Sequence, residues 1–110
     1  MELTVPERIA LLGVLPAQGS AVTLRIVREL QGRLSFSEEE IKHYSIKNTT
    51  KEDGSLFVSW NPELSNEETD IEIGEAARGV ITGQLKRLDA RGQLHLSMLP
   101  IYEKFVEDKA

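Results

Sequence analysis

Three long stretches of the chain place apolar residues at the three- and four-residue spacing that lines one face of a helix. The first stretch begins after Thr4, which can form a capping box with Glu7 in the first turn, and it stops at Pro16. The third ends at Gly92, because a glycine in the left-handed conformation commonly closes a helix. The apolar face of the second comprises Val22, Ile26, Val27, Leu30 and Leu34. The pattern predicts core helices over Pro6–Leu15, Ala21–Leu34 and Gly74–Arg91.

Two shorter helices are predicted from their starting residues. Ser37 with Glu40 makes a second capping-box pattern, and it opens a helix that reaches about Tyr44. A last short helix is predicted over Ser97–Val106, with Pro100 in its first turn, where proline is tolerated.

A β-hairpin is predicted in the middle of the chain. Asp53-Gly54 is a strong turn signal between two segments, Ser45–Asn48 and Leu56–Trp60. In the second segment Leu56, Val58 and Trp60 alternate with Phe57 and Ser59. Phe57 and Trp60 therefore lie on opposite faces of the strand, and one of them should be less buried than the other. A further short strand is predicted over Asp70–Ile73, leading into the third core helix. Thr69 and Glu72 support the alternative that a capping box starts this helix early.

Together these elements predict one domain spanning residues 1–110, in the mainly helical α+β class. It should hold about five helices with a small antiparallel β-hairpin or three-stranded sheet. The apolar run from Ile9 to Leu15 is far shorter than the roughly 20 residues that cross a bilayer, and it lacks the positive flank of a signal peptide. We therefore expect a cytoplasmic protein that does not bind membranes.

Composition narrows the classes of function. The chain has no cysteine, which excludes disulfides, thiol catalysis and thiolate metal sites. The only histidines, His43 and His95, have no second histidine at metal-binding spacing, so no metal site is predicted. No catalytic constellation or cofactor-binding motif is present in the sequence, and we expect a protein that is not an enzyme.

Two glycines lie inside the third predicted core helix. Gly79 and Gly83 should each cost about 1 kcal/mol relative to alanine, and with Ala76 they form a stripe of small residues. The stripe could let another helix of the same chain approach closely. It could instead serve self-association or a protein partner, or have no role.

An acidic segment precedes this helix. From Asn61 to Ala77 there are six acidic residues and no lysine or arginine. The candidate contacts for a basic protein partner are Glu63, Glu67 and Glu68. The simpler interpretation is a surface that repels anions.

The order of elements supports an alternative function. Three helices followed by a hairpin resemble a winged-helix DNA-binding domain, in which cations would contact phosphates. The candidate cations are Arg25, Arg28, Arg33, Lys47 and Lys51. Two features oppose this function: the net charge is −5, and three glutamates open the helix that would enter the groove.

Four segments carry a resemblance to a protein family: Glu7–Pro16, Phe36–Ile41, Trp60-Asn61 and Tyr102–Val106. They resemble small proteins of about this length that are encoded in phages and prophages. The resemblance implies an accessory role in a bacterial cytoplasm and no specific activity. The sequence thus favours a non-catalytic protein that acts through a protein partner, with DNA binding as the alternative.

Overall fold

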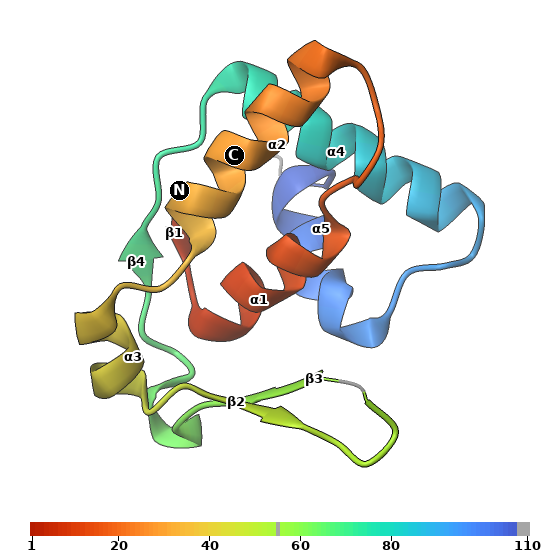
Figure 1. Ribbon diagram of the computed structural model, residues 1–110. Helices are drawn as coiled ribbons and strands as arrows, with labels where there is room; N and C mark the ends of the chain where they lie inside the picture. The colour runs from red at the N-terminus through yellow and green to blue at the C-terminus, as the bar shows by residue number, and fades with distance from the viewer. Residues whose placement is uncertain (55, 108–110) are drawn as a thin grey trace.

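Residues 1–54 and 56–107 are described by the computed structural model, in which five α-helices accompany two separate two-stranded sheets (Figure 1). The helices are α1 (Val5–Val14), α2 (Ala21–Leu34), α3 (Glu38–Tyr44), α4 (Glu75–Ala90) and α5 (Leu99–Phe105). The strands are β1 (Glu2–Leu3), β2 (Lys47–Thr50), β3 (Leu56–Ser59) and β4 (Thr69–Asp70), and the 3-10 turns are η1 (Pro62–Leu64) and η2 (Leu96–Met98). The predicted mainly helical α+β class is confirmed.

The two predicted capping boxes are confirmed, whereas the last helix begins at Leu99 rather than at Ser97 and has no side-chain cap. The Glu7 amide donates to the Thr4 hydroxyl at 3.3 Å, and the Thr4 amide donates to the Glu7 carboxylate at 2.9 Å. Ser37 and Glu40 make the same reciprocal pair at the start of α3. Because these caps satisfy amides that a helix leaves unbonded, they fix where each helix begins.

The core lies where α4 packs against α1, α2 and α5. Ile81 and Leu85 are fully buried on the inner face of α4, as the helical spacing predicted. Val22 differs from the prediction, because its side chain is 65% exposed. The first turn of α2 projects beyond the core, and the buried positions of this helix begin at Val27. The clustered core residues are Leu3, Leu11, Val14, Leu30, Leu34, Ile71, Ile81, Leu85, Ile101 and Phe105.

The strand predicted at Asp70–Ile73 lies slightly earlier and is shorter. It is β4, which pairs antiparallel with β1 so that Glu2 faces Asp70 and Leu3 faces Thr69. The alternative capping box at Thr69 is wrong, because α4 begins only at Glu75, after Gly74. The Ile71 amide donates instead to the Met1 carbonyl at 2.8 Å, which keeps this segment extended.

The predicted hairpin is confirmed, with Lys47 opposite Ser59 and Thr50 opposite Leu56. Gly54 in its turn has a φ of 85°, a left-handed conformation that favours glycine. The first strand begins later than predicted because Ser45 is left-handed as well, with φ 55°, and closes α3. The hairpin remains a separate sheet in the described part of the chain, and with α3 it extends from the helical body (Figure 1).

Arg8, to which the sequence analysis gave no role, is buried to 2% exposure on α1. Its Nε donates to the Leu34 carbonyl at 3.2 Å, and Nη2 donates to the Ser35 carbonyl at 2.8 Å. Nη1 pairs with the Glu40 carboxylate, and the Phe36 ring lies 4.1 Å from the guanidinium carbon. One side chain of α1 therefore binds the end of α2, the connection that follows it and the start of α3.

We expect Arg8→Met to destabilise the fold by about 1–3 kcal/mol, the usual cost of leaving buried hydrogen-bonding groups without a partner, because Glu40 is 26% exposed and water can solvate its carboxylate. Methionine preserves the apolar stem but leaves two carbonyls and the Glu40 carboxylate without their donor. Urea unfolding monitored by circular dichroism gives the measurement. Arg28→Met, on the exposed face of α2, is the matched control and should change the unfolding free energy by no more than about 0.5 kcal/mol. Equal effects from the two variants would contradict the role of Arg8.

The same ion pair should make stability depend on pH. The hydrogen bond from Arg8 lowers the pKa of Glu40, against the opposing effect of partial burial. A carboxyl whose pKa is lower in the folded state stabilises the protein fully above its ordinary pKa. That contribution disappears as the pH falls through the lowered value. We expect the urea midpoint to decline as the pH falls below about 5, and to decline less steeply in Glu40→Gln. Parallel profiles for the two proteins would exclude this contribution.

Candidate interaction surfaces

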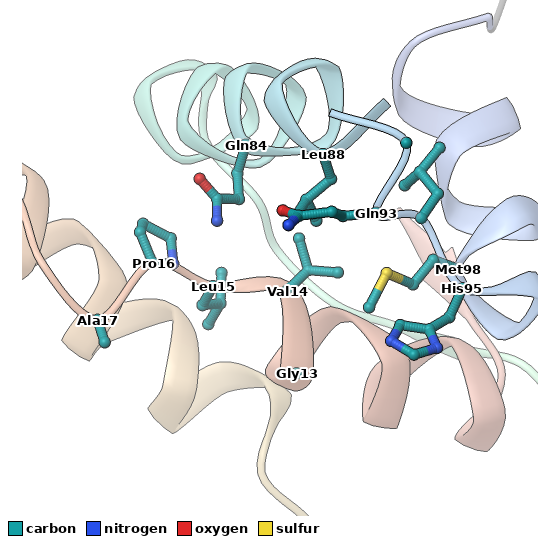
Figure 2. Close-up of a pocket in the computed structure, with 12 residues that line it drawn as sticks. Gly13, Val14, Leu15, Pro16, Ala17, Gln84, Leu88, Gln93, His95 and Met98 are labelled. Atoms are coloured by element: carbon teal, nitrogen blue, oxygen red, sulfur yellow. The ribbon is translucent and has the colours of Figure 1, made fainter. Parts of the chain in front are cut away.

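A groove lies where the end of α1 faces the C-terminal half of α4 and the segment that follows it. Its volume is about 560 Å³. Figure 2 shows Pro16 and Ala17 at one end of the groove and His95 and Met98 at the other. The apolar part of the lining comes mainly from Val14, Leu15, Leu88, Leu94 and Met98. Apart from Val14, these side chains are only half-buried, so the groove exposes apolar surface to solvent.

Two amide side chains border this groove. Gln84 projects from α4, Gln93 projects from the segment after α4, and both point over the apolar lining (Figure 2). Gly92, with φ 64°, turns the chain just before Gln93. An amide both donates and accepts hydrogen bonds, so this pair can bind the backbone of an extended peptide.

A second recess, of about 300 Å³, lies on the hairpin and η1. Phe57, whose side chain is 49% exposed, lies on one side of it and Trp60, which is half-buried, on another. The Trp60 Nε1 donates to the Ser65 hydroxyl at 2.9 Å, so this polar atom already has a partner. Apart from Ser59 and Ser65, the recess is lined by apolar residues: Phe57, Val58, Trp60 and Pro62.

The glycine stripe on α4 makes no close helix contact within the described part of the chain. A Cβ atom built on Gly79 meets no atom within 4 Å, and one on Gly83 meets only the flexible end of Arg87 at 3.8 Å. The hypothesis of close packing inside the chain is therefore wrong. The helices that pack against α4 contact the face that carries larger side chains, such as Ile81 and Leu85, rather than the glycine stripe.

Most carboxylates of the acidic segment contact polar or charged groups from elsewhere in the chain. Glu67 contacts His43 of α3 at 3.0 Å, and Glu68 lies 3.9 Å from Lys104 of α5. Glu63 is exposed, and its amide donates to the Asn61 side chain at 3.1 Å. The three candidate residues thus lie on one segment, but two of them already bind other elements.

Two more acidic residues of this segment behave in the same way. Asp70 pairs with the amino group of Met1 at 3.0 Å, and Glu72 pairs with Arg33 of α2 at 3.1 Å. The segment therefore connects the N-terminus, α2, α3 and α5 through successive carboxylates. Its charge serves contacts inside the protein, an arrangement that composition alone did not indicate.

The five cations of the DNA-binding alternative do not gather on one face. Arg25 and Arg28 are exposed on α2, whereas Lys47 and Lys51 belong to the hairpin at the other end of the molecule (Figure 1). Arg33 donates hydrogen bonds to the carboxylates of Glu29 and Glu72, and these bonds raise its pKa. The Lys51 ammonium lies 5.2 Å from the centre of the Phe57 ring. Two of the three glutamates at the start of α3, Glu38 and Glu39, are exposed to solvent, and they would repel a phosphate backbone.

Neither His43 nor His95 belongs to a cluster of possible metal ligands among the described residues. Within the described ranges, no group of three or more carboxylate and imidazole side chains is arranged to hold a metal ion. His43 pairs with Glu67, and His95 borders the groove of Figure 2. Over residues 1–54 and 56–107, the structure also contains no helix with the length and apolar character needed to span a membrane.

Comparisons of the chain with protein-family models, curated proteins and solved structures found no match.

We expect Gly79→Ala to stabilise the protein by about 0.5–1 kcal/mol, because the added methyl group meets open space and alanine favours a helix. Urea unfolding measures the gain. Gly54→Ala provides the opposite control, since the positive φ of Gly54 strains any other residue and the variant should be less stable. Destabilisation by Gly79→Ala together with a loss of oligomeric mass would show instead that this face packs against a second copy.

Proposed function

We propose that this protein is a non-catalytic interaction protein that binds a protein partner through its hairpin. The proposal rests on one observation, the aromatic recess that Phe57, Val58, Trp60 and Pro62 form outside the helical core. A single exposed apolar side chain is ordinary, but apolar side chains gathered in one open recess mark a site of interaction.

The chemistry of the recess favours a protein over other partners. Tryptophan and tyrosine, with arginine, contribute much of the binding energy at protein interfaces, and the centres of those interfaces are depleted in charge. Trp60 already bonds Ser65, so binding would mainly remove apolar surface from water. Lys51 extends over the Phe57 ring, and its charge can lie at the polar rim of such an interface.

An accessory role belongs to the same proposal. The resemblance of the sequence to small phage- and prophage-encoded proteins supports an accessory protein that acts in a bacterial cytoplasm. The scattered cations and the exposed glutamates of α3 support a protein partner rather than duplex DNA.

Phe57→Ser should abolish capture of the partner from a bacterial lysate while leaving the fold intact. Its side chain is half-exposed on the hairpin, so we expect the free energy of unfolding to change by about 1 kcal/mol or less. Val22→Ser is the matched control, because it removes an exposed apolar side chain from α2. Pull-down from nuclease-treated lysate with quantitative mass spectrometry compares the three proteins.

The expected result is a set of proteins retained by the wild type and by Val22→Ser but lost with Phe57→Ser. Equal retention by all three proteins would refute the hairpin as the interface. Salt-sensitive binding to random duplex DNA at about 50 mM salt, weakened by Arg25→Ala or Arg28→Ala, would favour the winged-helix function instead.

A further inference from the structure

The groove of Figure 2 continues into a second recess that carries positive charge. The two recesses share Pro16, Ala17 and Gln84, and the second is also lined by Arg87 and Arg91 of α4 and its end. Its volume is about 390 Å³. An apolar floor, the amides of Gln18, Gln84 and Gln93, and two guanidinium groups therefore border one continuous surface.

The charge of this surface differs from that of the protein as a whole. The chain carries 18 acidic against 13 basic residues, yet no carboxylate lines either recess in the described part of the chain. Arg87 and Arg91 are exposed and make no ion pair with any described residue. Asp89, which lies between them in sequence, accepts a hydrogen bond from the Tyr102 hydroxyl at 3.1 Å.

A helix end accounts for part of this arrangement but not for all of it. Cations near the C-terminus of α4 are favoured by about 0.3–1 kcal/mol through the helix dipole. The dipole does not explain why half-buried Leu88, Leu94 and Met98 border an open groove next to those cations. Apolar surface beside unpaired guanidinium groups matches a ligand that is both apolar and anionic.

We propose that this groove binds an acidic peptide segment of a protein partner, with an apolar side chain on the floor and carboxylates at Arg87 and Arg91. Guanidinium groups bind carboxylates through two parallel hydrogen bonds, which gives direction as well as affinity. Gln84 and Gln93, which point over the apolar lining (Figure 2), would bind the peptide backbone. The groove lies on α1, α4 and the segment after α4, so this inference does not depend on the hairpin surface.

A nucleic acid is the competing ligand for two exposed arginines. Non-specific nucleic-acid binding depends on several phosphate contacts made together, and two cations provide few of them. A nucleic acid would also leave the apolar floor of the groove without a partner. These observations favour the peptide.

The experiment measures fluorescence anisotropy with labelled synthetic peptides that place one leucine between aspartates. Matched peptides replace the aspartates with asparagine or the leucine with serine. We expect the acidic leucine peptide to bind more tightly than either matched peptide by about tenfold or more, and to bind more weakly as salt rises. Backbone amide NMR signals of Gln84, Gln93 and Met98 should shift when it binds.

Two double variants test whether the peptide binds at Arg87 and Arg91 rather than at other exposed arginines. Arg87→Gln/Arg91→Gln should lose most of this affinity, whereas Arg25→Gln/Arg28→Gln, with the same change of net charge on α2, should retain it. Circular dichroism melting checks that both double variants fold. Equal losses in the two variants would overturn the proposal, as would no binding of the acidic leucine peptide or shifts confined to other residues. A single-stranded oligonucleotide that binds this site more tightly than the peptide would replace it with nucleic-acid recognition.

Discussion

A buried guanidinium connects three helices of this protein. Taking an ionised side chain out of water costs on the order of several kcal/mol unless the protein replaces the hydrogen bonds that water made. Arg8 replaces them with the carbonyls of Leu34 and Ser35 at the end of α2 and with the Glu40 carboxylate of α3. The carbonyls at the end of a helix need partners of their own, so the arrangement satisfies both sides. A helix of seven residues such as α3 is not stable alone, and this contact fixes it to the body.

The local part of the fold could be predicted from sequence because its causes are local. Both capping boxes, the hairpin turn at Gly54 and the bounds of α2 depend on residues within a few positions of each other. The second partners of the same residues could not be predicted. Glu7 caps α1 and also binds Lys104, and Glu40 caps α3 and also binds Arg8. Those partners are 97 and 32 residues away, and no spacing rule connects them.

The candidate surfaces were less predictable than the fold for the same reason. Alternation in the second hairpin strand indicated that Phe57 and Trp60 face opposite ways, so one of them should be more exposed, and Phe57 is. The groove beside α4 joins residues 13–17 to residues 84–98, and its amides look like ordinary surface residues in the sequence. The glycine stripe left several roles open, and the sequence alone could not choose among them, because a small residue can face open solvent as well as a neighbouring helix.

The pairing of β1 with β4 has a consequence for the order in which the chain can fold during synthesis. Leu3 is fully buried against elements that are made later, and its strand has no partner until about residue 70 has emerged from the ribosome. Lys104, which contacts both the Glu2 carbonyl and Glu7, is added later still. The helix pair α1 and α2 can meet early, since few residues separate them. The nascent chain must therefore keep its first strand unpaired, and Leu3 without its packing partners, until those elements are translated, and a chaperone could bind the strand during that period.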